Sequence, residues 1–186
     1  MRSYPVRLVV SALVVMAGAA LPALGQQKQS RPPAAAPATR PAANAPKEIG
    51  RFEDWIAATH DESGQLACYA FTRALSSQPA MPGRGDVVLT VTERTTPRDA
   101  VAISAGFNYS ATAAVTVAVG ATTFQFYTAQ RSAFARDGHA AITAFEKGDR
   151  VTAKSPTPKG TGVTDTFSLR GFTAAYGAIN KACPPK

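Results

Sequence analysis

The residues with the most distinctive chemistry in this 186-residue chain are its only two cysteines, Cys68 and Cys183. They follow an N-terminal segment with the pattern of an export signal, and paired cysteines in exported domains typically form a structural disulfide. A bond between them would close a loop of more than a hundred residues, for which chain-entropy models give about 4 to 5 kcal/mol of stabilisation. The cysteines therefore predict one disulfide, Cys68 to Cys183, rather than a metal or redox site.

The remaining reactive side chains do not form a recognisable catalytic set. His60 and His139 are the only histidines, and neither has a second imidazole or a cysteine at metal-ligand spacing. The sequence contains no Gly-x-Ser-x-Gly, Ser-x-x-Lys or His-Glu-x-x-His motif. Acidic pairs occur at Glu53-Asp54, where adjacent strand residues would point to opposite faces, and at Asp61-Glu62, which is typical of a solvated turn. We therefore expect no catalytic, metal or cofactor site.

One short motif has the chemistry of an adhesion sequence. Arg84, Gly85 and Asp86 form an Arg-Gly-Asp tripeptide within a Pro- and Gly-rich segment. Such a loop can engage integrins when a guanidinium and a carboxylate are exposed at opposite ends of a turn. Three-residue matches are also frequent by chance, and the alternative is an ordinary hairpin turn. These three residues are the candidate adhesion site.

The N-terminal region predicts export and a tether. Residues 1–25 combine basic residues, an apolar run and small residues at Ala23 and Gly25, so we expect a signal peptide that is cleaved after Gly25. The apolar run is slightly shorter than the roughly 20 residues of a membrane span, and we expect no span after cleavage. Residues 26–48 are rich in Ala and Pro and predict a flexible linker.

Residues 49–186 predict a single domain with one hydrophobic core, since they contain Trp55 and all nine phenylalanines. Most of the chain's net charge of +8 lies before this domain. The basic residues of the domain do not cluster in the sequence, so we expect no nucleic-acid partner.

The domain is predicted to be mainly β (α+β), with a β-sandwich-like sheet and two helices. Runs of β-branched and aromatic residues, broken by Gly, Pro and Asp, indicate the strands. The predicted strands are 52–59, 67–73, 87–93, 100–107, 114–119, 122–127, 149–155 and 164–169. Gly120-Ala121 is expected to form a tight hairpin turn. Apolar residues at helical spacing predict one helix near 137–147 and a C-terminal helix near 170–182.

Several segments of this domain resemble the invasion associated locus B family of bacterial exported proteins. They are Phe52-Glu53-Asp54-Trp55, Cys68-Tyr69, the run from Thr164 to Ala175, and the closing Cys183. In that family an Asp-Trp pair opens the first strand, a Cys-Tyr pair lies in the second, and a Ser-Leu-basic-Gly-Phe segment begins the last helix. The resemblance covers essentially residues 49–186. Thr59 stands where the commonest members carry another cysteine, so the chain resembles a shorter, single-disulfide branch.

The resemblance implies a non-enzymatic exported protein of the cell envelope that contributes to host-cell association or invasion. It would act in the periplasm, or after secretion at the outer surface, on a protein or envelope component or on the host-cell surface. Two alternatives stay open. One is a periplasmic module, chaperone-like in action, that binds peptides along a sheet edge. The other is an envelope enzyme that hydrolyses cell-wall glycan.

Overall fold

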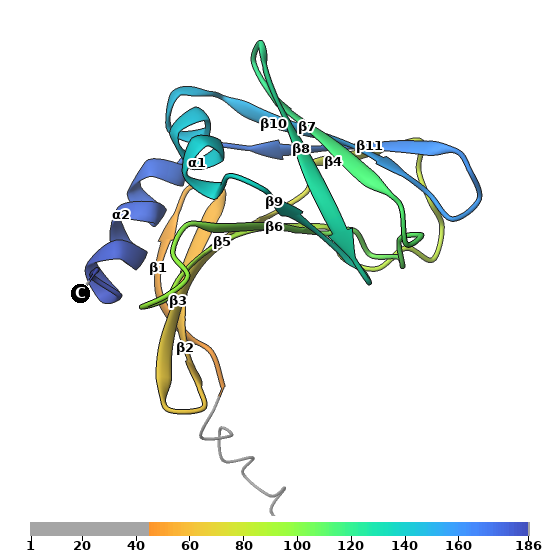
Figure 1. The fold of residues 1–186 in the computed structure, drawn as a ribbon. Coiled ribbons are helices and arrows are strands. Elements are labelled where there is room, and N and C mark those ends of the chain that lie inside the picture. Colours follow the sequence, from red (N-terminus) through yellow and green to blue (C-terminus); the bar gives the residue numbers. More distant parts are fainter. Residues whose placement is uncertain (1–44, 186) are drawn as a thin grey trace, which may run out of the picture. The chain divides into compact units, whose positions relative to one another are not determined.

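Eleven strands of one antiparallel sheet and two helices make up the part of the chain that the computed structural model describes, residues 45–185 (Figure 1). The strands are β1 (Lys47–Phe52), β2 (Trp55–Glu62), β3 (Gln65–Arg73), β4 (Ser76–Gln78), β5 (Val88–Glu93), β6 (Ala100–Ser104), β7 (Ala114–Val119), β8 (Thr122–Ala129), β9 (Ser132–Ala135), β10 (Arg150–Pro156) and β11 (Gly162–Ser168). The helices are α1 (Gly138–Lys147) and α2 (Phe172–Ala182). The prediction of a mainly β domain with two helices, one of them C-terminal, is confirmed. The predicted signal peptide 1–25 and most of the predicted linker 26–48 lie outside the described residues.

The sheet curls over so that its far end returns to β3. Its strand order is β1-β2-β3-β5-β6-β9-β8-β7-β10-β11-β4, and β4 follows β3 in the chain after only two residues. The backbone N–H of Ala74 donates to the carbonyl of Val87, whereas that of the next residue, Leu75, donates to Thr166 on β11. The chain therefore passes from one half of the sheet to the other at this point, which produces the sandwich-like arrangement.

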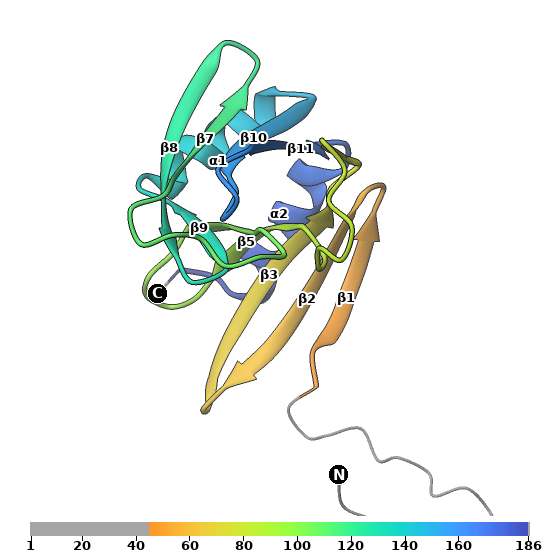
Figure 2. The same ribbon diagram turned by 90° about the vertical axis from the view of Figure 1, so that its right-hand side faces the viewer.

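The core lies between the two halves of the sheet and beneath the helices. Val115, Val117 and Val119 alternate toward it along β7, as their period of two predicts. The helix α2 packs against β1, β2 and β3 (Figure 2). Its first residue, Phe172, contacts the indole of Trp55 with ring centroids 4.8 Å apart. The largest fully buried side chains are Trp55, Phe126, Phe145, Phe167 and Phe172.

Local sequence signals account for the starts of both helices and for the turn of the β7–β8 hairpin. The Asp137 carboxylate accepts a hydrogen bond from the N–H of Ala140 at 2.9 Å and so caps α1. Gly120 and Ala121 form the predicted turn between β7 and β8. Gly171, before α2, has a φ of 83° and leaves no room for a Cβ atom against the carbonyl of Phe52. A glycine is required there because other residues rarely adopt this φ and would also clash.

The strands β1, β4 and β9 were not predicted from the sequence, and one predicted strand begins at the wrong residue. No residue of β1 is buried, β4 consists of Ser-Ser-Gln, and β9 has only four residues, so none shows a periodic apolar pattern. We expected a strand from Phe52 to Thr59, but Glu53 and Asp54 form the tight turn between β1 and β2, with Glu53 at a φ of 50°. The strand predicted at 100–107 ends at Ser104.

Trp55 provides a direct test of this packing. Its indole is fully buried, and its Nε1–H donates to the carbonyl of Ser168 at 3.0 Å. We expect Trp55→Ala to lower the free energy of unfolding by about 3 to 5 kcal/mol, because it leaves a cavity and an unpaired carbonyl. The matched control, Ile49→Ala at a 38% exposed position on β1, should cost less than about 1 kcal/mol. Urea denaturation of the mature chain measures both, and equal losses would contradict the packing described.

Candidate functional site

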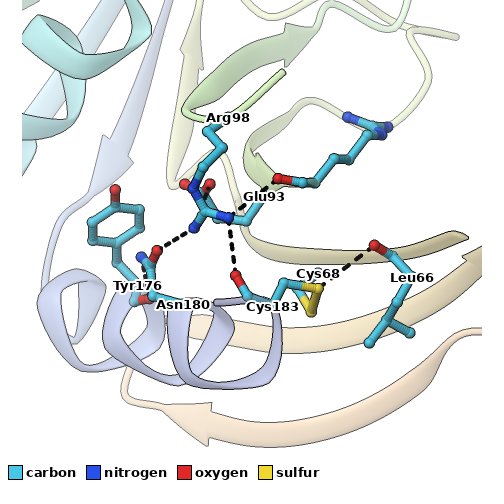
Figure 3. The surroundings of a disulfide bond; sticks show 8 residues. Leu66, Cys68, Glu93, Arg98, Tyr176, Asn180 and Cys183 are labelled. Atoms are coloured by element: carbon cyan, nitrogen blue, oxygen red, sulfur yellow. Dashed lines mark hydrogen bonds and ion pairs between the residues drawn. A yellow bond between two sulfur atoms is a disulfide. The ribbon is translucent and has the colours of Figure 1, made fainter. Parts of the chain in front are cut away.

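The predicted disulfide is present and fastens the end of α2 to the sheet. Cys68, on β3, and Cys183, directly after α2, are joined, and their Cα atoms are 5.9 Å apart. That separation lies within the usual range for a disulfide. Both residues are buried, and no free cysteine is left. Figure 3 shows the disulfide and its surroundings.

Arg98 reinforces this attachment from the loop between β5 and β6. Its guanidinium donates to the carbonyl of Cys183 at 3.0 Å and to Oδ1 of Asn180 at 2.6 Å. The same group forms an ion pair of 3.0 Å with the carboxylate of Glu93 at the end of β5 (Figure 3). One side chain therefore links the C-terminal end of α2 to the sheet, beside the disulfide.

Glu93 is the most perturbed acid in the described residues. Its side chain is fully buried, and its Oε1 has no hydrogen-bond partner among them. Burial is the main cause that raises the pKa of Glu93 to about 7, and the neighbouring Asp99 carboxyl adds to the shift. A buried carboxyl of this kind can be neutral near physiological pH.

Asp99 lies beside Glu93 and extends the cluster of Glu93 and Arg98 toward the surface. Burial opposes its ionisation, but hydrogen bonds from Tyr176 and the other neighbouring groups prevail and hold the pKa of Asp99 below its ordinary value. The hydroxyl of Tyr176 donates to Asp99 at 2.7 Å, and Nδ1 of His139 lies 3.1 Å from the same carboxylate. Burial and this hydrogen bond raise the pKa of Tyr176 well above its usual range. The cluster's bonds run mainly between its own members, so its evident role is to hold α2 and α1 in place.

A second buried ion pair involves the predicted adhesion motif. The Arg84 guanidinium donates to both carboxylate oxygens of Asp165, at 2.7 Å each, and its Nε–H donates to the carbonyl of Ala105. The side chains of Arg84 and Asp165 are only 5% and 0% exposed. Ser77, on β4, donates to the same carboxylate at 2.7 Å. This network joins β4, β11 and the two loops that flank β5 and β6.

The Arg-Gly-Asp tripeptide consequently does not have the geometry that integrin binding needs. The guanidinium of Arg84 is buried, whereas Asp86 is exposed and pairs with Arg73. Gly85 lies against the backbone of Gly106. The segment is a loop between β4 and β5 rather than the simple hairpin turn of the alternative prediction. In this conformation, Arg84 is a structural residue.

The other residues weighed in the sequence lie in separate parts of the fold, except that His60, Asp61 and Glu62 are consecutive. His60 lies on β2, and Asp61 and Glu62 end that strand. The carboxylate of Asp61 accepts from the N–H of Gly64, as expected for a turn, and Glu62 pairs with Arg94 at 2.7 Å. No group of three or more His, Cys, Asp or Glu side chains within residues 45–185 could hold a metal ion. Neither helix in that range is long and apolar enough to cross a membrane.

An open cleft of about 940 Å³ lies at the end of the sheet where α1 and α2 join it. Turns and strand ends line it, and they contribute Lys147, Arg150 and Arg170 together with Asp54 and Asp149. These five charged side chains are exposed. The cleft therefore offers charged groups of both signs to a ligand, and it contains none of the sequence-predicted site residues.

Sequence reasoning did not identify Glu93 and Asp165, although a signal was available. Glu93 continues the inward alternation of Leu89 and Val91 along β5, and Asp165 stands between Val163 and Phe167 on β11. An acid at a core-facing strand position must be paired or neutralised, so each implied a partner. Their partners, Arg98 and Arg84, lie in loops and could not be inferred from periodicity.

The disulfide predicts a specific pattern of mutant stabilities. Cys68→Ser, Cys183→Ser and the double variant should each lose about 2 to 5 kcal/mol, and nearly the same amount, because all three remove one bond. Denaturant titration of the three proteins measures this. A double variant that loses the sum of the two single effects would show that the cysteines act independently.

Glu93 predicts a pH dependence of stability. Its folded pKa of about 7 lies above the ordinary value of 4.5, so its contribution to stability is fully present below about pH 4.5 and is lost as the pH rises through 7. Glu93→Gln keeps a neutral group at this site. Relative to the wild type, this variant should therefore become more stable between pH 5 and pH 8.

Glu62→Gln is the matched control for Glu93→Gln. The hydrogen bond from Arg94 lowers the pKa of Glu62, so the stability that this carboxylate contributes is present above its ordinary pKa and disappears as the pH falls. In thermal melts, the stability difference between Glu62→Gln and the wild type should change only below pH 4.5, whereas that of Glu93→Gln should change between pH 5 and pH 8. With rising pH, Glu62→Gln should become less stable and Glu93→Gln more stable than the wild type. A Glu93→Gln variant whose difference from the wild type did not change with pH would contradict a raised pKa.

Comparison with known proteins agrees with the resemblance seen in the sequence. The family model of the invasion associated locus B (IalB) protein matches residues 55–180. Among solved structures, the crystal structure of invasion associated protein B from Bartonella henselae is similar to this chain, with a TM-score of 0.53 and 11% sequence identity. The likeness covers 72% of this chain and 95% of that one, and at this identity it concerns the fold. No curated protein matches the chain. Because the family model spans more than half of its length, the chain belongs to the invasion associated locus B family.

Proposed function

We propose that this protein is an exported, non-enzymatic component of the cell envelope that binds a partner and contributes to host-cell association. The name of the family and that of the similar protein from Bartonella henselae both refer to invasion. A buried disulfide is typical of proteins that fold outside the reducing cytoplasm. The N-terminal export pattern supports the same location, in the periplasm or at the outer surface.

The main support for this proposal is that the buried charged side chains pair with one another. Arg84 pairs with Asp165, and Arg98 pairs with Glu93, so both buried acids serve to join segments of the fold. An active site instead aims perturbed groups at a space that a substrate can enter. A fold whose buried charges are engaged internally presents its surfaces for binding.

A second candidate function rests on the open cleft. Asp54 and Asp149 both line it, and glycan hydrolysis requires two carboxylates that flank a bond. Under this alternative, Asp54→Asn and Asp149→Asn would each abolish release of sugars from cell-wall glycan while thermal stability stayed normal. Under our proposal, the wild-type protein releases no sugars from that substrate.

Peptide binding along a sheet edge has weaker support. β1 is an edge strand of six residues, long enough for a peptide to pair with it. However, a register shift between Glu48 and Gly50 interrupts its pairing with β2, and Glu48 and Arg51 form an ion pair beside it. Bulges and charges on an edge strand are common devices that prevent further strand addition.

Deletion of the gene in its native host tests the proposed function. We expect the deletion strain to associate with host cells several-fold less than the wild type, and growth in broth to be unchanged. Expression of residues 1–186 should restore association, whereas expression of residues 26–186, which lack the export signal, should not. Detection of the protein in periplasm, outer membrane and medium accompanies the assay. Normal association by the deletion strain would refute the role.

A further inference from the structure

The face of the sheet that points away from the core carries a continuous row of register partners. The row crosses six neighbouring strands from β2 to β8. Its members, in spatial order, are Ile56, Phe71, Thr90, Ala102, Phe134 and Tyr127. Six strands at about 4.8 Å spacing give this row a length of roughly 24 Å along the curved sheet. We call this row and its same-face neighbours the outer platform.

Aromatic side chains stand at both sides of the outer platform, and small ones lie between them. Tyr69 and Phe71 are neighbours on β3, with ring centroids 6.0 Å apart. Tyr127 and Phe134 stack across β8 and β9 at 5.5 Å. Between the two pairs lie β5 and β6, which contribute small residues to this face, so aromatic rings border a low central strip.

No helix covers the outer platform among residues 45–185. The buried residues of α1 and α2 join the core on the opposite face of the sheet. Tyr127 is 44% exposed and is one of only four large apolar or aromatic side chains in the described residues with such exposure. The other three aromatic residues, Tyr69, Phe71 and Phe134, are half-buried, and an apolar patch that is left uncovered in this way commonly marks an interaction site.

The charges on this face favour an acidic partner. The Arg136 guanidinium lies over the ring of Tyr127, 5.6 Å from its centroid. Arg131 directly precedes β9 and is exposed, and its guanidinium lies beside Gly85 in the loop between β4 and β5. Neither arginine forms an ion pair with a described carboxylate, unlike Arg73, which pairs with Asp86. A second copy of the chain would bring these like charges together across a two-fold axis, which is unfavourable.

The polar groups of the outer platform suit sugars better than a peptide. Thr90, Thr92, Ser104 and Ser132 lie on this face, and none of their hydroxyls makes a hydrogen bond to a described residue. Each strand beneath them pairs on both sides, so no free backbone edge is available to an added peptide strand. Strand faces that combine aromatic rings with polar side chains bind oligosaccharides in other β folds.

We propose that the outer platform binds an acidic polysaccharide. Sugar rings would pack against Tyr127 and Phe134, the free hydroxyls would bond the sugar hydroxyls, and acidic substituents would pair with Arg136. This inference rests on the proposed function as a binding protein and gives its partner a chemical class. It uses neither the cleft nor the buried charge pairs.

Binding of the purified mature protein to heparin and hyaluronan oligosaccharides tests this assignment. Neutral dextran, polyglutamate of matched charge and phosphatidylglycerol vesicles are the comparison ligands. We expect at least one acidic oligosaccharide to bind about ten-fold or more tightly than any of these three. The assignment is overturned if neither oligosaccharide binds, if polyglutamate or the vesicles bind equally well, or if Tyr127 instead controls a monomer–dimer equilibrium.

Variants separate ring stacking from general charge attraction. Tyr127→Ala should weaken binding about ten-fold, whereas Tyr127→Phe, which keeps the ring, should change it by less than about two-fold. Arg136→Ala should weaken binding, and its matched control Arg150→Ala, an exposed arginine on β10 outside this face, should not. Thermal melts check folding. Equal losses for the two arginine variants, or no loss for Tyr127→Ala, would reduce the binding to nonspecific electrostatics and overturn the assignment.

The two proposals fail in different ways. If neither oligosaccharide binds but the deletion strain still loses host-cell association, the ligand assignment is wrong and the proposed function stands. If the oligosaccharide binds in a Tyr127-dependent manner but the deletion strain associates normally, the ligand assignment stands and the host role is wrong.

Discussion

The attachment of α2 to the sheet is the constraint on which the rest of this fold depends. The helix begins where Gly171 allows the chain to pass the β1–β2 turn, and Phe172 at once fills the space beside Trp55. It ends at Cys183, which the disulfide joins to β3 and which Arg98 holds through its carbonyl. Between these ends, the apolar side of α2 closes the core. Trp55, Gly171, Phe172 and both cysteines also lie in the segments that carry the family resemblance.

The buried ion pair of Arg84 and Asp165 connects β11 to the loops around it. Removing Arg84 and Asp165 from water is costly, and this cost is offset only because the pair is bidentate and Ser77 supplies a further hydrogen bond. The network contributes to the fold because it joins β4 to β11, at the place where the sheet curls back toward β3. The Arg-Gly-Asp match therefore reflects the role of Arg84 within the fold.

Periodicity predicted those parts of the fold that bury one face. The β7–β8 hairpin and both helices were predicted because their apolar residues alternate or recur at helical spacing. β1 and β4 form the two edges of the sheet and bury little, so their residues carry no such pattern. The pairing of Glu93 with Arg98 depends on tertiary contacts across a loop, and the outer platform depends on the register of six strands. A single sequence specifies neither directly.

Hydrogen exchange of the native protein, with the disulfide intact and after reduction, tests the central claim most directly. If the disulfide and Arg98 hold α2 on the sheet, amides of α2 such as those of Ala175 and Ile179 should exchange only through global unfolding in the oxidised protein. After reduction, these amides should open locally, while amides of β7 and β10 remain protected. Equal protection of α2 in the two states, or loss of protection throughout the sheet at the same rate as in α2, would contradict this account.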